Sequence, residues 1–132
     1  MKGFITFGLA LLPASVVFVA FVAWAGAPGD LAGNYVCRGE DKGETYAIPL
    51  TVSALGDTWQ FMWTDNQGNP VLAGLALPHG DYLAVALWHP KGAIGTASYR
   101  VRNGRLEGRW TKGDGHVIDE TCTRGRVGDR AA

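Results

Sequence analysis

"YRVRNGRLEGRW", residues 99–110, is the stretch of the chain that decides the fold. Its centre, Asn103-Gly104, is the strongest short-range signal for a two-residue type I′ hairpin turn. A two-residue turn fixes the pairing of the flanking strands, so Tyr99 faces Gly108. Because side chains alternate between the two faces of a strand, every arginine points to one face. The other face takes the large apolar side chains Tyr99, Val101, Leu106 and Trp110.

The arginine side of this hairpin is interpreted first as its solvated face. Arg100 lies opposite Glu107, and we expect an exposed ion pair there, worth at most about 1 kcal/mol. Arg102, Arg105 and Arg109 remain as a small basic face suited to an anionic partner. Nucleic acid is not expected as that partner, because the formal net charge of the chain is zero.

Turn signals recur about every 8 to 12 residues along the chain, a spacing typical of all-β sandwiches and barrels. Examples are "EDKGE" (40–44) and "DNQGNP" (65–70). Every connection is short, so we expect strands that are neighbours in sequence to pair as antiparallel hairpins. Seven turns divide eight expected strands, at about 34–39, 45–54, 58–64, 71–77, 82–88, 96–102, 105–111 and 116–124.

The two cysteines, Cys37 and Cys122, lie in the first and last expected strands. An even pair predicts a disulfide in an exported protein, and no C-x-x-C motif favours a metal or redox role. A meander has two open edges; closing it into a barrel removes both and brings its first and last strands together. We therefore predict an all-β fold, a closed eight-stranded antiparallel up-and-down barrel, with Cys37 bonded to Cys122.

The N-terminal segment predicts export. No charged residue occurs between Lys2 and Asp30, and the apolar run 16–27 carries A-x-A triplets, as in a helical secretory signal peptide. The alternative is a retained membrane anchor, since about 20 apolar residues span a bilayer. We expect a periplasmic or secreted protein. It would contact the membrane only if the leader is not cleaved. Its parts are the leader (1–27), the barrel domain (31–124) and a polar tail (125–132).

The interior of the barrel is the second place where function can lie. In a barrel of eight strands the interior is either filled by side chains or holds one small ligand, and both alternatives stay open. Tyr82 and Trp88 also indicate an apolar contact surface on the outside. For a ligand at one mouth we expect a lining of aromatic side chains from Trp59, Trp63, Trp88 and Trp110.

One inward carboxylate follows from the pairing. A turn at "GDG" (113–115) sets Gly108 opposite Glu120, and the cysteine register sets Gly39 on its other side. Glu120 then points inward between two glycines, with Tyr99 one strand further on as a hydrogen-bond donor. The alternative is that Glu120 lies near the rim of the barrel and is exposed to solvent. Tyr99 and Glu120 complete the set of expected ligand-binding residues.

Catalytic and metal-binding patterns are weak. A single carboxylate without a paired acid, base or nucleophile makes a poor catalytic case, so we expect neither an enzyme nor a cofactor. His89 and His116 belong to loops at the same mouth, with Asp114 nearby. Loop histidines are usually surface residues, and we expect no metal site.

The opening of the barrel segment resembles known families. "LAGNYV" (31–36) places a Gly-x-aromatic motif at the start of the first strand, similar to lipocalin-type and avidin-type barrels. Those calycin-like families are eight-stranded meanders that bind small ligands. In lipocalins an arginine near the last strand packs over that first aromatic residue, which implies Arg124 beside Tyr35 here. The long mouth loops of lipocalins and the biotin-contact pattern of avidins are missing.

A second resemblance is to the small periplasmic inhibitors of C-type lysozyme. "NYVC" (34–37), "GTASY" (95–99) and "GRLEGRW" (104–110) are similar to motifs of that family, whose Gly-Ser-rich stretch is largely missing. The chain also looks like short exported bacterial domains with G-x-Y and L-x-G-x-W motifs. That likeness implies fold and export only.

Two functions are therefore expected as alternatives. The first is non-enzymatic binding of a small hydrophobic or amphipathic ligand at a barrel mouth. The second is a protein-interaction or inhibitor module that meets an exported partner through the rim and the arginine face. An interior void of about 300 Å³ or more favours the first, and a filled barrel with an apolar outer patch favours the second.

Overall fold

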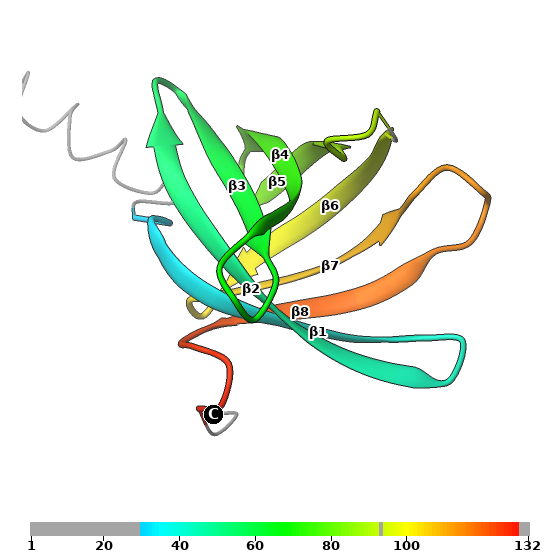
Figure 1. Ribbon diagram of the computed structural model, residues 1–132. Helices are drawn as coiled ribbons and strands as arrows, with labels where there is room; N and C mark the ends of the chain where they lie inside the picture. Colours follow the sequence, from blue (N-terminus) through cyan, green and yellow to red (C-terminus); the bar gives the residue numbers. More distant parts are fainter. Residues whose placement is uncertain (1–29, 93, 130–132) are drawn as a thin grey trace, which may run out of the picture.

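The protein is described by a computed structural model that covers residues 30–92 and 94–129; the expected leader lies outside these residues. Eight strands form one closed antiparallel barrel (Figure 1). Across the described residues no helix is long and apolar enough to cross a membrane. The strands are β1 (Gly33–Asp41), β2 (Glu44–Leu55), β3 (Thr58–Thr64), β4 (Pro70–His79), β5 (Tyr82–Trp88), β6 (Ile94–Arg102), β7 (Arg105–Thr111) and β8 (Ile118–Arg124).

The barrel closes between its first and last strands, as predicted. β1 pairs with β8 in a register that sets Cys37 opposite Cys122 and Gly39 opposite Glu120. The two cysteines form a disulfide. All other strand pairs join strands that are adjacent in sequence, so the topology is an up-and-down meander.

The Asn103-Gly104 turn joins β6 and β7 in the predicted register, with Tyr99 opposite Gly108 and Val101 opposite Leu106. Both turn residues have positive φ, as a type I′ turn requires. Tyr99 and Leu106 are buried inside the barrel. On the outer face three of the four arginines are exposed and Arg105 is half-buried, which confirms the predicted orientation of the hairpin.

The expected ion pair between Arg100 and Glu107 is wrong. Arg100 Nε contacts Asp81 Oδ2 at 3.1 Å, and Glu107 contacts Arg105 at 2.9 Å. Arg100 and Glu107 each have a nearer partner of opposite charge. Arg105 lies two residues from Glu107 on the same face of β7, and Arg100 lies opposite Tyr82, beside Asp81, in the pairing of β5 with β6.

One end of the barrel is packed with side chains. Its core includes Tyr35, Phe61, Leu83 and Leu106. Buried Leu31 belongs to this core, and the Tyr35 hydroxyl donates a hydrogen bond to the Leu31 carbonyl at 2.9 Å.

Arg124 covers this closed end from outside. Its Cζ atom lies 5.0 Å from the centre of the Tyr35 ring. Its guanidinium donates to the carbonyl oxygens of Ala32 and Asp30 at 3.0 and 2.6 Å. The packing that the lipocalin resemblance implied is therefore present, and the ligand-sized space lies toward the other end.

Candidate ligand-binding cavity

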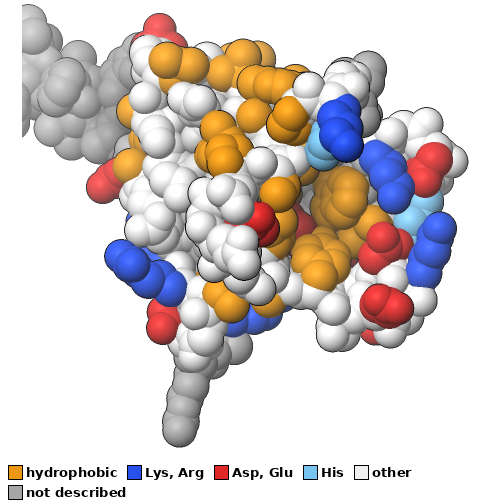
Figure 2. Space-filling model, in the orientation of Figure 1, with side chains coloured by type: hydrophobic (Ala, Val, Ile, Leu, Met, Phe, Trp, Pro, Cys, Tyr) orange, Lys and Arg blue, Asp and Glu red, His pale blue; other side chains and the backbone are white. Residues whose placement is uncertain are grey.

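A cavity of about 620 Å³ lies in the half of the barrel away from Arg124. Figure 2 shows hydrophobic side chains gathered in this hollow, with acidic and basic side chains around its edge. The turns that follow β1, β3, β5 and β7 surround its mouth. The wall is formed largely by the apolar residues Ile48, Pro49, Trp63, Val71, Leu72 and Leu87.

One polar group interrupts this apolar wall. In the paired strands, Glu120 on β8 lies between Gly39 of β1 and Gly108 of β7. Beyond those glycines lie Tyr46 on β2 and Tyr99 on β6, each directly opposite one of them. Since a glycine has no side chain, each tyrosine reaches over a whole strand to the same carboxylate.

The two glycines are required by this close approach. A Cβ atom on Gly39 would collide with the Tyr46 hydroxyl and the Asp119 carbonyl oxygen. A Cβ atom on Gly108 would overlap the backbone carbonyl of Ser98. The sequence therefore leaves space at both positions for the tyrosines and the neighbouring backbone.

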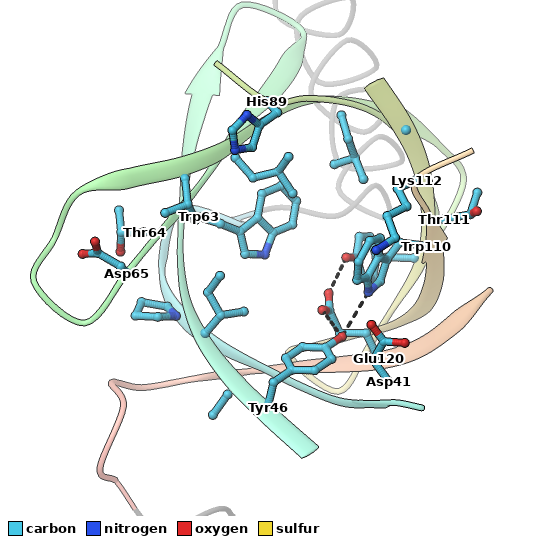
Figure 3. A pocket seen from close by; sticks show the side chains of 18 of the residues that line it. Asp41, Tyr46, Trp63, Thr64, Asp65, His89, Trp110, Thr111, Lys112 and Glu120 are labelled. Carbon is cyan, nitrogen blue, oxygen red and sulfur yellow. Dashed lines mark hydrogen bonds between the residues drawn. The ribbon is translucent and has the colours of Figure 1, made fainter. Parts of the chain in front are cut away.

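The polar side chains form a connected hydrogen-bond network (Figure 3). The Tyr99 hydroxyl donates to Glu120 Oε1 at 2.6 Å, and the Tyr46 hydroxyl donates to Oε2 at 2.7 Å. Trp110 Nε1 donates to the Tyr46 hydroxyl oxygen at 3.0 Å. The sequence predicted the bond from Tyr99, and the network adds Tyr46 and Trp110.

Burial dominates the electrostatics of Glu120. The side chain is 6% exposed, and its removal from water raises its pKa above the ordinary value. Hydrogen bonds from Tyr99 and Tyr46 to the carboxylate oppose this rise. Burial, together with the nearby Glu120 charge, also raises the pKa of Tyr99, so its hydroxyl stays protonated and remains a donor.

The edge of the cavity carries Asp41, Asp65, His89 and Lys112. Asp65 organises the β3–β4 loop, because its Oδ1 accepts hydrogen bonds from the backbone N–H groups of Gln67 and Asn69 at 2.8 and 2.9 Å. The bond from Asn69 is the main cause that holds the pKa of Asp65 below its ordinary value. The loop at this side of the mouth is therefore fixed by its own hydrogen bonds.

The histidines of this mouth have separate partners. His89 Nδ1 accepts a hydrogen bond from the Lys91 backbone at 3.0 Å, and His116 Nε2 lies 3.1 Å from Asp41 Oδ1. Asp114 instead accepts a bond from the backbone of His116.

Glu120 also lies beside Cys122, with Oε1 3.6 Å from Sγ. That sulfur belongs to the disulfide, so it has neither a hydrogen to donate nor a thiolate to bind a metal. The closeness of the two side chains is therefore a packing contact.

Four of the six expected ligand-binding residues line the cavity: Trp63, Tyr99, Trp110 and Glu120. Trp63 lies across the opening from Trp110 and Glu120 (Figure 3), as follows from the positions of β3 and β7 on opposite sides of the closed ring. The cavity thus has an apolar side near Trp63 and a polar side at Glu120.

The structure places Trp59 and Trp88, both expected to line the mouth, outside the lining of the cavity. Trp59 packs against the core but is not among the residues that line the cavity, because it lies toward the start of β3, away from the mouth. Trp88 is 43% exposed. It lies on the outer face because Leu87 and Val85 take the inward positions of β5.

Tyr46 is the residue of the site that the sequence analysis missed. A signal for it was present in "EDKGE". Lys42 and Gly43 both have positive φ and form a two-residue turn that sets Asp41 opposite Glu44 and Gly39 opposite Tyr46. The turn rule that placed Tyr99 over Gly108 would also have placed Tyr46 over Gly39.

The fold and the cavity together define a class of protein: a small closed antiparallel barrel of eight strands with a cavity that opens at one end. This architecture is compatible with a calycin-like fold. No protein-family model matches the chain, and no curated protein matches it at a significant level. Function therefore has to be inferred from the cavity itself.

Proposed function

We propose that the protein is an exported, non-enzymatic binding module that takes a small hydrophobic or amphipathic ligand into the cavity of its barrel. The observation that carries this proposal is a void of about 620 Å³ with apolar walls and one buried polar cluster. Small-molecule sites are typically cavities of about 300–1,000 Å³ with a few placed polar groups among apolar side chains.

Two further features support the proposal. The Cys37–Cys122 disulfide is consistent with an oxidising compartment, and therefore with export. Glu120 is held by tyrosine hydroxyls, and within the described residues no second carboxylate or histidine contacts it. General acid–base catalysis usually needs a second such group in reach, so the cluster suits ligand binding better than turnover.

A fluorescence titration with the neutral apolar probe N-phenyl-1-naphthylamine tests the proposal. Leu72 lines the cavity, so Leu72→Trp fills part of it. We expect saturable binding to the wild-type protein and loss of binding in Leu72→Trp. Trp88→Ala is the matched control, because Trp88 is an aromatic residue outside the cavity. Equal binding to all three proteins, or no binding to any, would contradict the proposal.

An interaction module remains the second candidate, and an outer apolar patch is the observation that favours it. Leu75, Leu77, Tyr82 and Trp88 are exposed on the outside of β4 and β5, with Leu77 at 60%. The expected basic face is less available, since Arg105 and Arg109 contact Glu107 and Asp119. Loss of partner capture in Trp88→Ala, with probe binding intact, would favour this second function.

A further inference from the structure

Glu120 is a buried carboxylate whose hydrogen-bond partners are all neutral. The oxygens accept hydrogen bonds from Tyr99 and Tyr46, and the side chain lines the cavity. Within residues 30–92 and 94–129 no lysine, arginine or histidine side chain contacts it. An ionised carboxylate removed from water is costly unless a positive group pairs with it.

The directions of the hydrogen bonds suit the ionised form of this carboxylate. The indole N–H of Trp110 is a donor only, so the Tyr46 oxygen must accept from it. The hydroxyl hydrogen of Tyr46 is then free to point at Glu120 Oε2. Tyr99 can donate to Oε1 in the same way, and both oxygens then act as acceptors, as in a carboxylate.

Acidic side chains outnumber lysine and arginine around the cavity. Asp41 and Asp65 also line it, and Lys112 is the one lysine or arginine among the described lining residues. Asp41 has His116 as a neighbour at 3.1 Å, outside the lining. An excess of negative charge at a concave, largely apolar opening attracts cations and repels anions.

We propose that the ligand of this cavity is a hydrophobic amine in its protonated form. Its ammonium group donates to Glu120 and supplies the positive partner that the buried carboxylate otherwise lacks. Its apolar body lies against Trp63 and the aliphatic side chains on the opposite wall. This inference rests on the proposed ligand-binding function and adds the chemistry of the ligand's polar end.

The electrostatic reason for selectivity is the low dielectric of the cavity. An ammonium–carboxylate hydrogen bond is roughly twice as strong as a neutral one. The aromatic side chains beside Glu120 also favour a cation over an anion. A carboxylate ligand of similar length would bring a second negative charge toward Glu120 and be repelled. An alcohol carries no charge, so it would gain only a neutral hydrogen bond.

Four probes with alkyl chains of about seven or eight carbons and different polar ends separate these cases: octylamine, octanol, octanoate and N-octylacetamide. Affinities for the full wild-type protein are measured by titration calorimetry at neutral pH and low salt. We expect octylamine to bind about tenfold or more tighter than octanol and N-octylacetamide, and octanoate to bind weakest. This series needs no variant, so it stays decisive if substitutions impair folding.

Glu120→Gln keeps the shape of the side chain and removes its charge. We expect this variant to lose the preference for octylamine, with octanol affinity changed by less than about threefold. Trp88→Ala is the control and should keep all four affinities. Equal affinity for octylamine and octanol in the wild-type protein, or an unchanged preference in Glu120→Gln, would overturn the inference while leaving the proposed function standing. If none of the four probes binds, the proposed function fails as well.

Discussion

At the scale of single residues, burial and charge act against each other at Glu120. Its carboxylate lies in an apolar interior, and two tyrosine hydroxyls supply hydrogen bonds without supplying charge. Replacing a polar group in such a network usually destabilises a protein. Replacing Glu120 also removes a buried negative charge, which stabilises the protein. The net change in stability therefore depends on pH, because pH sets how much of Glu120 is ionised.

The pH dependence of stability tests the electrostatic account of Glu120. Burial raises the folded-state pKa above the ordinary value of 4.5. The unfolded chain therefore releases this proton at lower pH than the folded protein does. The wild-type protein should lose stability relative to Glu120→Gln as pH rises from about 4.5 toward neutral, by at most about 1.4 kcal/mol per pH unit.

Urea unfolding of both ligand-free proteins at several pH values measures this difference. Comparison with Glu120→Gln cancels the contributions of all other titrating groups that the substitution leaves unchanged. If the wild-type protein gained stability over the variant with rising pH, the pKa of Glu120 would be lowered rather than raised.

Gly108→Ala tests the close approach beside Glu120. The added Cβ would overlap the backbone carbonyl of Ser98, which has no flexible side-chain atom to move aside. We expect a loss of about 1–3 kcal/mol in the free energy of unfolding, measured by chemical denaturation. Arg109→Ala, on the outer face of the same strand, is the control and should change stability by less than about 0.5 kcal/mol. Equal effects of the two substitutions would contradict the account of Gly108.

At the scale of elements, hairpins give the barrel its register and the β1–β8 pair closes it. The closing pair joins strands far apart in sequence, with Cys37 and Cys122 separated by 85 residues. Every other strand pair is adjacent in sequence and needs only a short turn. The disulfide therefore joins β1 and β8, the strand pair whose formation costs the most chain entropy.

Replacing both cysteines, in the variant Cys37→Ala/Cys122→Ala, should destabilise the protein by about 4 kcal/mol, because the bond closes a loop of most of the barrel. Thermal and urea unfolding measure the loss. Reductant should produce a similar loss in the wild-type protein and no change in the double variant. A wild-type protein whose stability is indifferent to reductant would show that the bond contributes little.

At the scale of the whole molecule, the barrel separates a largely apolar interior from an outer surface that carries most of the charged side chains. The outer arginines contact nearby acidic residues: Arg100 with Asp81, Arg105 with Glu107 and Arg109 with Asp119. These pairs are largely exposed, and exposed pairs contribute about 0–1 kcal/mol. Ligand binding and stability should therefore depend on the interior, and solubility and encounter with partners on the exterior.

The variant Arg102→Gln/Arg105→Gln/Arg109→Gln tests this separation. We expect the free energy of unfolding to change by less than about 1 kcal/mol and probe affinity in the cavity to stay the same. Urea unfolding and the fluorescence titration measure the two quantities. A large loss of probe affinity would show that the outer basic face takes part in ligand binding.

The sequence by itself determined the strand order, the faces and the closure of the barrel. Short turns such as Asn103-Gly104 set the register of each hairpin, and the strict alternation of side chains then assigned inside and outside. The disulfide linked the two ends, and the same register placed Glu120 between Gly39 and Gly108. These features are local or follow from pairing, so a sequence can carry them.

Only the tertiary structure decided which half of the barrel is hollow and which side chains reach it. Trp59 and Trp63 share the inward face of β3, yet only Trp63 lines the cavity, because the two lie toward opposite ends of that strand. The partners of the outer arginines were likewise chosen by side-chain reach rather than by direct pairing. The hydrogen bond from Tyr99 to Glu120 was predicted, but the bond from Tyr46 on the other side of β8 and the link to Trp110 were seen only in the structure. Such meetings depend on barrel curvature and on the space left by glycines, which no single hairpin determines.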